Sequence, residues 1–536
     1  MSLGPRISIA YHVPGAARRR TVVIAGDGSM LGNNDARQLG VEVLGDENVR
    51  RVRVRPVLSV VIDKISAVME LGLNAADAIY LNGYNSWTDS VERPTAGRMW
   101  GLTRASKRVV KKYALDASGD YRFVAEDPRR GHQHGFGYGY VRQGDSVLLF
   151  GSLDEDSGFT VIREDLGARI ITFDKEPPNR IVRRHEELEI FSLCVEGGTL
   201  EEALGRYLAR AGIARRPARP IVGYTSWYRH YGNIDVWHLR KDLEGASWVL
   251  GGLDLGSADP VFQIDDGYAK VGDWLEFDRL RFPEGPGELA RMSKERGLIP
   301  GLWIAPFVCE RHSRMFVEHR DWLLRDKDGS VVRTGSQWSG GIALDVRNPS
   351  VRDYVRNVLR VVTRVWGFKL LKLDFLYAAC MVPHDGMNRG ELMADALELL
   401  RSSVDDDVRL LLCGVPMTSA FGRCEYCRVG PDVGLDWDDK LHMRLLHRER
   451  VSTKNSLANA RGRRHLDGMV FRCDPDVLFL RDEGVSFTLR QREEMIQTDT
   501  TCGGVLFTSD DMAAWNTQQL DAFHYVLEAF KEYNQC

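Results

Sequence analysis

The chain has 536 residues, of which 43% are hydrophobic and 27% are charged, enough to build the cores of two or three domains. This composition excludes a disordered chain. The 72 basic and 75 acidic side chains nearly cancel, leaving a net charge of −3. We therefore expect neither a nucleic-acid partner nor an anionic membrane surface, since both need a strong field of one sign.

The first residues do not look like a targeting segment. Residues 1–13 already contain Arg6 and His12 and lack the apolar core of a signal peptide. No later stretch approaches the roughly 18 uncharged apolar residues of a membrane span. We expect a soluble, cytoplasmic protein. Nine cysteines scattered over the chain do not form a dense disulfide framework, so we interpret most of them as reduced core thiols.

The first part of the chain is rich in short β-like runs. They are broken by Gly, Asp, Asn and Pro, and the clearest cover residues 21–25, 52–63, 146–152, 169–173 and 188–195. Many short strands separated by turn signals are typical of two packed antiparallel sheets. The sequence therefore predicts an N-terminal β-sandwich domain over residues 1–198.

A helical segment follows, with the apolar side chains of residues 199–212 on one face. It leads into a stretch with prolines at Pro217 and Pro220, which disfavour a continuing helix. We interpret residues 199–220 as a helical linker and residues 221–536 as a second domain.

Eight short apolar runs alternate with helical patterns in this second domain. The runs cover residues 221–228, 261–268, 299–307, 368–375, 408–415, 426–433, 469–476 and 504–509. The clearest helix between them spans residues 350–366. Strands that alternate with helices form parallel sheets, and eight such units predict a (β/α)8 TIM barrel. A doubly wound open sheet is the alternative. The predicted fold is thus a multi-domain α/β protein.

Polar residues gather where the predicted barrel strands end. In a barrel of this kind the chemistry lies at the carboxyl ends of the strands. Carboxylates accept hydrogen bonds from hydroxyl groups, and tryptophan faces pack against the C–H side of a sugar ring, so the pattern favours a sugar site. The polar residues are Asp265, Asp266, Lys372, Asp374, Cys413, Gly414, Arg428, Asp432, Asp474 and Asp476, with Trp227, Tyr228, Trp303 and Trp437 at comparable depths.

Asp374 and Asp432 are the candidate catalytic pair. Alternation along the strand places Lys372 and Asp374 on one side, pointing inward, and a purely structural Lys–Asp ion pair is the alternative for them. Asp432 follows Gly430 and Pro431, which end the strand, so a simple turn Asp is the alternative there. Two carboxylates about 5 to 5.5 Å apart would form a retaining glycosidase pair.

Asp265 and Asp266 are candidates for holding substrate. An exposed acidic turn before Gly267 is the plainer interpretation. Two adjacent carboxylates can also bind neighbouring hydroxyl groups of a hexose, and such a site rejects an epimer whose hydroxyl is misplaced.

Several motifs in order resemble glycoside hydrolase family 36, the α-galactosidases and their raffinose-synthase relatives. The motifs are the segment 81–87 (LNGYNSW), then 223–228 (GYTSWY), 263–268 (QIDDGY), 301–306 (GLWIAP), 345–349 (DVRNP), 372–374 (KLD) and 428–432 (RVGPD). Each motif alone is weak, whereas the ordered set covers most of the chain and is specific.

The resemblance implies a role for each matching residue. It implies that Asp374 is the nucleophile and Asp432 the acid/base. It also implies a subsite for the terminal sugar, closed from above by Trp87 of the β-domain and lined by Asp265, Asp266, Trp303, Lys372, Cys413, Gly414 and Arg428. The implied activity releases terminal α-linked galactose from a galactoside or oligosaccharide with retention, through a glycosyl-aspartate and without a metal or organic cofactor.

Three departures from the family pattern keep alternatives open. Phe307 stands where many members carry Glu, residues 415–421 are bulkier than the usual glycine-rich stretch, and the last helix, 517–533, nearly ends the sequence, where members usually continue into a C-terminal β-sandwich. A raffinose-synthase-like galactosyl transferase, an α-N-acetylgalactosaminidase and a non-catalytic sugar-binding relative are the alternatives. A homo-oligomer is compatible with the sequence.

A metal site is not predicted. Cys424 and Cys427 have the spacing of zinc ligands, but neither a second pair nor suitably spaced histidines accompany them.

Overall fold

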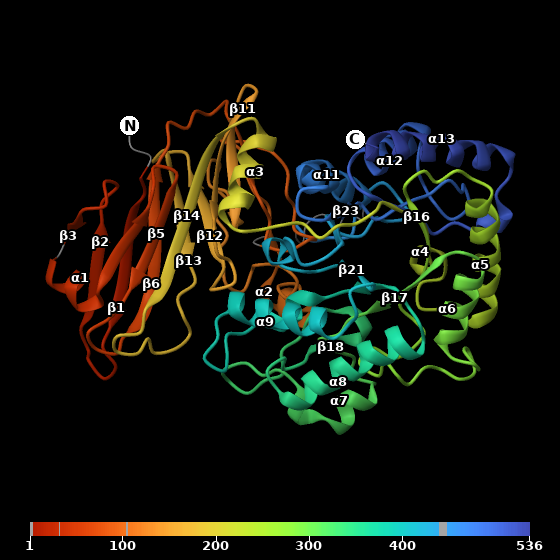
Figure 1. Cartoon of the computed structure of the whole chain (residues 1–536), viewed down its shortest axis with the longest axis horizontal. Helices are drawn as coiled ribbons and strands as arrows, with labels where there is room; N and C mark the ends of the chain where they lie inside the picture. The colour runs from red at the N-terminus through yellow and green to blue at the C-terminus, as the bar shows by residue number, and fades with distance from the viewer. Residues whose placement is uncertain (1–3, 32, 103–104, 439–447, 536) are drawn as a thin grey trace.

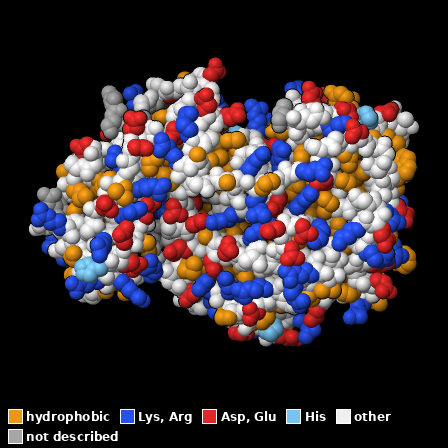
Figure 2. All heavy atoms as spheres, viewed as in Figure 1, with side chains coloured by type: hydrophobic (Ala, Val, Ile, Leu, Met, Phe, Trp, Pro, Cys, Tyr) orange, Lys and Arg blue, Asp and Glu red, His pale blue; other side chains and the backbone are white. Residues whose placement is uncertain are grey.

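The computed structural model describes residues 4–31, 33–102, 105–438 and 448–535. Strands β1 to β14 form one end of the molecule, and the later strands and helices form the other (Figure 1). Basic and acidic side chains are interspersed over the visible surface (Figure 2). No helix within the described ranges is long and apolar enough to cross a membrane.

Two antiparallel sheets of seven strands make up the N-terminal part. The first has the order β3 (Met30–Leu31), β2 (Arg19–Ile24), β1 (Arg6–His12), β6 (Val61–Glu70), β13 (Ile170–Lys175), β12 (Thr160–Asp165) and β9 (His134–Phe136). The second has the order β4 (Val41–Gly45), β5 (Val49–Val54), β14 (Leu188–Gly198), β11 (Ser146–Ser152), β10 (Tyr138–Gln143), β7 (Ala78–Leu81) and β8 (Arg93–Pro94).

Both sheets contribute to one hydrophobic cluster. Ile9 and Ile65 of the first sheet and Val52 and Leu193 of the second belong to it and are fully or almost fully buried. The alternation of buried and more exposed residues along β1 explains why one face of that strand joins this core. The predicted strand over residues 52–63 is wrong as a single element, because β5 ends at Val54 and β6 begins at Val61.

A helix connects the sheets to the rest of the chain. Helix α3 (Leu200–Arg210) begins at Thr199, whose side chain and that of Glu202 form a capping box. Its buried face carries Ala203, Leu204 and Tyr207 and packs on β14 and β11. Two short helices, α1 (Asn33–Leu39) and α2 (Lys107–Tyr113), lie earlier in the chain.

A parallel sheet of nine strands forms the second part. Its strands are β15 (Ile221–Thr225), β16 (Asp259–Ile264), β17 (Ile299–Ile304), β20 (Leu370–Leu373), β21 (Arg409–Leu412), β22 (Tyr426–Arg428), β23 (Arg472–Asp474), β24 (Val477–Leu478) and β25 (Val505–Thr508). Each of the eight apolar runs in the sequence overlaps one of these strands, and β24 lies just after the run 469–476.

The pairing of the strands joins the two edges of this sheet. Strands β23 and β24 are separated only by Pro475 and Asp476. β23 pairs with β22, whereas β24 pairs with β25, which in turn pairs with β15. Because β23 and β24 act as two pieces of one broken strand, the nine strands occupy eight positions around a TIM-barrel fold.

Helices cover the outside of this sheet (Figure 1). They are α4 (Trp227–His230), α5 (Val236–Gly251), α6 (Pro286–Glu295), α7 (Arg314–Glu318), α8 (Pro349–Arg360), α9 (Arg389–Ser402), α11 (Thr453–Arg463), α12 (Leu489–Thr501) and α13 (Thr517–Asn534). Helix α8 begins with an Asn348 cap and buries Val351, Val355 and Leu359. It ends at Arg360, six residues before the predicted end at residue 366, and a π-helical turn, Val361–Val365, follows it.

The loop after β7 ties the N-terminal sheets to the barrel. The Ser86 backbone N–H donates to the Val415 carbonyl at 2.9 Å, and the Ser86 hydroxyl accepts from the Gly414 N–H at 2.8 Å. Fully buried Arg463 of α11 donates to the carbonyls of Ser86 and Asn85. These bonds fix the loop at the end of β21, beside the candidate site.

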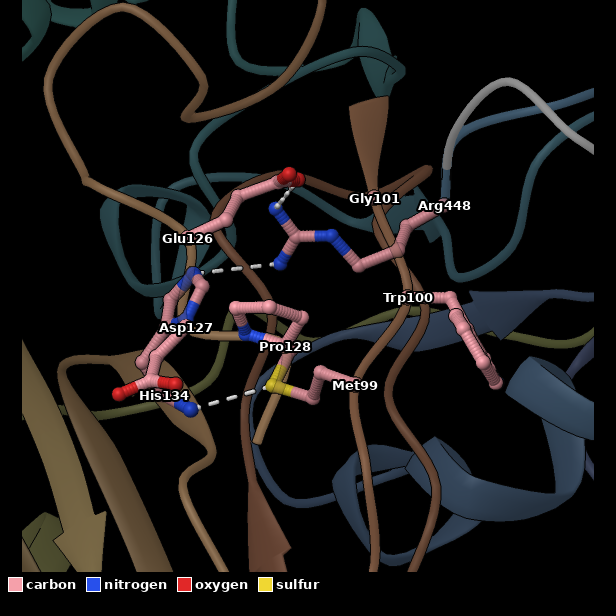
Figure 3. Close-up of a pocket in the computed structure, with 8 residues that line it drawn as sticks. All are labelled: Met99, Trp100, Gly101, Glu126, Asp127, Pro128, His134 and Arg448. Carbon is pink, nitrogen blue, oxygen red and sulfur yellow. Dashed lines mark hydrogen bonds and ion pairs between the residues drawn. The ribbon is translucent and has the colours of Figure 1, made fainter. Parts of the chain in front are cut away.

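A second contact between the two parts is a buried ionic cluster (Figure 3). Arg448 of the barrel lies beside three N-terminal groups: it donates to Asp120, its Nη1 is 3.3 Å from His134 Nε2, and its Nη2 is 4.0 Å from Glu126. Burial and the nearby Arg448 lower the pKa of His134, despite the opposing effect of Asp120. Arg448 and His134 lower the pKa of Asp120 although burial opposes this.

Candidate functional site

The structure places the polar residues named from the sequence at the carboxyl ends of the barrel strands. Asp265 and Asp266 follow β16, Asp374 follows β20, and the pair Cys413–Gly414 follows β21. Arg428 and Asp474 are the last residues of β22 and β23. The parallel order of the strands explains why residues far apart in the sequence meet at one end of the barrel.

Lys372 forms its ion pair with Asp265. The Lys372 Nζ lies 2.9 Å from Asp265 Oδ2, and both side chains are buried. Burial opposes the charge on Lys372, but the carboxylates of Asp265 and Asp374 raise its pKa above the usual value. The bonded partner expected from strand alternation was Asp374. The pairing is different because Asp265, on a strand two positions away, reaches the lysine across the barrel.

Asp374 is held by two N–H groups. Its Oδ1 accepts from the Phe375 backbone at 2.8 Å, and its Oδ2 accepts from the Trp303 indole Nε1 at 2.9 Å. Trp303 pairs in register with Lys372 on the adjoining strand and is 2% exposed. Phe375 has a left-handed backbone (φ 54°), which points its N–H back at the carboxylate. These contacts fix the orientation of Asp374.

Arg428 links three carboxylates on the far side of the site. Its guanidinium contacts Asp432 at 3.0 Å, Asp474 at 3.2 Å and Asp476 at 2.7 Å. Arg428 is 3% exposed, so these bonds compensate a charge that would otherwise be costly to bury. Tyr228 also donates its hydroxyl to Asp476. The acidic cluster is therefore neutralised mainly by one arginine.

The pKa of Asp432 is raised above its ordinary value. Burial is the largest cause, Arg428 and Lys372 oppose it, and the negative charges of Asp374 and Asp265 add to it. The Asp432 side chain nevertheless keeps 38% of its surface exposed, so a ligand can reach the carboxyl. Asp432 thus combines access with a tendency to hold a proton.

Asp266 is bonded to a tryptophan that sequence reasoning missed. The Trp338 indole Nε1 donates to Asp266 Oδ2 at 2.8 Å. Burial, with the nearby charges of Asp265 and Glu310, raises the pKa of Asp266 to about 7, against the lowering effect of the Trp338 bond. Trp338 lies in the long segment between β17 and β20, in no apolar run. Its neighbours Gly340 and Gly341 were the available signal of a tight turn.

Trp87 reaches the site from the N-terminal part of the chain. Its indole Nε1 lies 3.2 Å from the Cys413 sulfur, and its ring packs edge-on against Phe375 at 5.0 Å. Gly414 has a φ of 58°, and a Cβ there would meet the Trp87 ring at 3.0 Å. A glycine is needed at this position for both reasons. Trp87 therefore packs against the Cys413–Gly414 segment at the end of β21.

Metal ligands do not cluster in the part of the chain that the structure describes. Within it, no group of three or more His, Cys, Asp or Glu side chains is arranged to hold a metal ion. The described cysteines, including Cys424 and Cys427, are free and buried.

Comparisons with known proteins agree on one family. A family model named Melibiase matches residues 256–389, the part that carries Asp265, Asp266, Lys372 and Asp374. The α-galactosidase AgaA of Geobacillus stearothermophilus is 32% identical over 159 residues, covering 29% of this chain and 21% of that protein. α-Galactosidase 2 of Pediococcus pentosaceus is 28% identical over 119 residues, covering 21% and 16%. The chain thus aligns with less than a quarter of the length of these curated relatives.

Solved structures match over nearly the whole chain. TtGalA, an α-galactosidase from Thermus thermophilus in complex with stachyose, has a TM-score of 0.72 and 25% identity, with 97% of this chain and 99% of that chain covered. The GH36 α-galactosidase AgaA from Geobacillus stearothermophilus has a TM-score of 0.62 and 12% identity, covering 99% and 76%, which supports the fold. The chain is thus similar in sequence and in fold to α-galactosidases of glycoside hydrolase family 36.

Proposed function

We propose that the protein is a retaining exo-α-galactosidase, which releases terminal α-linked galactose from galactosides or oligosaccharides. Asp374 attacks the anomeric carbon while the bond to the leaving oxygen breaks, and Asp432 gives that oxygen its proton. Asp432 then takes a proton from water, which attacks the anomeric carbon and releases Asp374. Asp374 and Asp432 are the catalytic residues of this proposal.

The contrast between the surroundings of these two carboxyl groups carries the proposal. Two N–H donors hold Asp374, as an attacking carboxylate needs. Asp432 has a raised pKa and an accessible side chain, as a proton donor needs. Two carboxyl groups with such different surroundings are the pattern expected of a nucleophile and an acid.

The surrounding groups fit a site for one hexose. Asp265, Asp266 and Lys372 offer charged partners for hydroxyl groups, each such bond being worth about 1.5 to 3 kcal/mol. Trp303 and Trp87 add aromatic faces beside them. Solved relatives hold stachyose and p-nitrophenyl α-D-galactopyranoside, which supports an α-galactoside as substrate here.

The proposal extends to the organisation of the chain. We infer an N-terminal β-sandwich over residues 1–198, a helical linker over 199–220 and a (β/α)8 catalytic barrel from residue 221 onward. The ends of β14 at Gly198 and of α3 at Arg210, and the start of β15 at Ile221, support these boundaries.

The test is hydrolysis of p-nitrophenyl α-galactoside, with the α-glucoside and the α-N-acetylgalactosaminide as controls. We expect turnover of the galactoside alone, and NMR of the first product should detect α-galactose. A first product in the β form would contradict the retaining mechanism. Galactose transferred to a sugar acceptor in place of free galactose would identify a transferase, and binding without turnover would identify a sugar-binding relative.

A further inference from the structure

We propose that Trp338 is a positioning residue of the sugar site, whose indole holds Asp266 in the orientation that accepts a hydroxyl of the terminal galactosyl unit. The inference rests on the proposed function and assigns a role to a residue outside the family motifs found in the sequence.

The first observation is the hydrogen bond itself. Trp338 Nε1 lies 2.8 Å from Asp266 Oδ2. Asp266 is 8% exposed and stands beside Asp265, which is already bonded to Lys372, Gln263 and the Asp266 N–H. A carboxylate turns about its last side-chain bond unless a partner holds it. The indole supplies such a partner from outside the strand that carries Asp266.

The second observation is that two tryptophans act as one unit. The ring centroids of Trp338 and Trp303 lie 6.0 Å apart, and Trp303 donates to Asp374 as Trp338 donates to Asp266. Each ring therefore orients one carboxylate, and the contact between the rings couples the two orientations. The group that would bind the sugar and the group that would attack it are set by the same aromatic pair.

The third observation is the contact with the residue next to Asp374. The Trp338 ring lies 4.7 Å from the Phe375 ring. Phe375 has a left-handed backbone and donates its N–H to Asp374. Loss of the Trp338 ring would therefore loosen the support of Asp374 as well as that of Asp266.

The fourth observation is the unfavourable backbone conformation at Trp338. Trp338 and Ser339 are both left-handed, with φ values of 50° and 60°. This conformation is unfavourable for residues with a side chain and persists where the surrounding structure imposes it. Bonds from the Thr334 N–H to the Gly341 carbonyl and from the Ala343 N–H to the Val332 carbonyl close the segment at its base. Trp338 is thus presented from a turn with a defined shape.

Trp338→Phe keeps a ring and removes only the N–H donor. We expect KM for p-nitrophenyl α-galactoside to rise about tenfold, the loss of one hydrogen bond to a charged group, with kcat changed less than about twofold because Asp374 keeps its partners. The dissociation constant of free galactose, measured by calorimetry, should rise by the same factor. Trp338→Leu also removes the ring beside Phe375, so it should lower kcat as well.

Trp322→Phe is the matched control, because Trp322 packs on His319 and Tyr354 in the same segment, away from the site. It should leave KM and kcat unchanged. Asp266→Asn completes a double-mutant cycle: adding Trp338→Phe to it should raise KM less than about twofold further, since the bond is already altered.

Two results would overturn the inference: a KM within twofold of wild type in Trp338→Phe, or effects of Trp338→Phe and Asp266→Asn that multiply. Both leave the proposed function standing if the wild-type chain hydrolyses the galactoside. A wild-type chain that neither hydrolyses galactosides nor binds galactose would overturn both.

Discussion

Asp374 and Asp432 are the same type of side chain with different hydrogen-bonding and ionic partners. Asp374 accepts from Trp303 and Phe375, whereas Asp432 shares Arg428 with two other carboxylates. In the proposed mechanism, these different surroundings account for the two different roles of the same type of side chain.

Alanine at either position should give a distinct kinetic result. We expect Asp374→Ala to abolish turnover of all α-galactosides, because it removes the proposed nucleophile. Asp432→Ala should slow the hydrolysis of substrates with poor leaving groups by about 100- to 10,000-fold, the usual contribution of a general acid. It should slow the hydrolysis of activated nitrophenyl substrates far less. Circular dichroism and melting temperature serve as folding controls. Wild-type rates in Asp374→Ala would refute the assignment of the nucleophile.

Asp266 should make stability depend on pH. Its pKa is raised from the ordinary 3.8 to about 7 by burial, with Asp265 and Glu310 nearby and Trp338 opposing. The folded state therefore holds the proton over a range in which the unfolded state releases it. The unfolding free energy should fall as pH rises from about 4 to 7, by at most about 1.4 kcal/mol for each pH unit from this one group, and then level off.

Asp266→Asn isolates that contribution. Denaturant unfolding at several pH values should give a wild-type stability, relative to the Asn variant, that decreases between pH 4 and 7. Asp353→Asn, which changes an exposed side chain on α8, is the surface control. A difference that grows with pH would contradict the raised pKa.

At the scale of elements, hydrophobic periodicity was sufficient to locate the barrel strands. In β20, for example, all four residues are buried, as expected for a short apolar run at the centre of a parallel sheet. The ends of the strands were harder to predict: β22 stops at Arg428 although the apolar run continues to Val433. The chain leaves the sheet just before Gly430 and Pro431. Arg428 at the strand end binds Asp432, Asp474 and Asp476, contacts that a local pattern does not contain.

The same limit applies to the candidate site. Residues in motifs, such as Asp374 and Arg428, were identified as candidate site residues because they lie in the predicted strands near their carboxyl ends. Trp338 lies on a turn with left-handed backbone, and the Lys372–Asp265 pair joins strands that are not neighbours. Such contacts depend on the closed barrel, so the spacing of residues along one strand does not reveal them.

For the whole molecule, the important feature is the contact between the N-terminal sheets and the segment that follows the proposed acid. Arg448 is bonded to Asp120, and the Ser452 N–H, four residues later, donates to the Asp432 carbonyl. Tyr121 reinforces the contact by accepting from the Arg448 N–H and donating to Glu449. The sheets thereby contact the segment that is bonded to the backbone of the proposed acid, Asp432.

Breaking this ionic cluster should destabilise the protein. Asp120→Asn leaves Arg448 without its main partner in a buried setting, and we expect a loss of about 3 to 5 kcal/mol in the free energy of unfolding. The double variant with Arg448→Met should lose less than the sum of the single variants, because the charges are coupled. Asp127→Asn, which breaks a surface pair with Arg129, should change stability by less than about 1 kcal/mol. Equal effects of Asp120→Asn and Asp127→Asn in chemical denaturation would contradict this account.

The Trp87–Cys413 contact makes the Cys413 thiol a reporter of the docking between the N-terminal sheets and the barrel. The Cys413 thiol lies at the junction of sheets and barrel, whereas Cys194 lies within β14 and Cys473 within β23, and all three are free and buried. We expect a water-soluble thiol reagent to modify Cys413 when the N-terminal sheets separate from the barrel. It should modify Cys194 or Cys473 only when β14 or β23 leaves its sheet. The order in which these cysteines react would therefore distinguish separation of the sheets from the barrel from unfolding of either part.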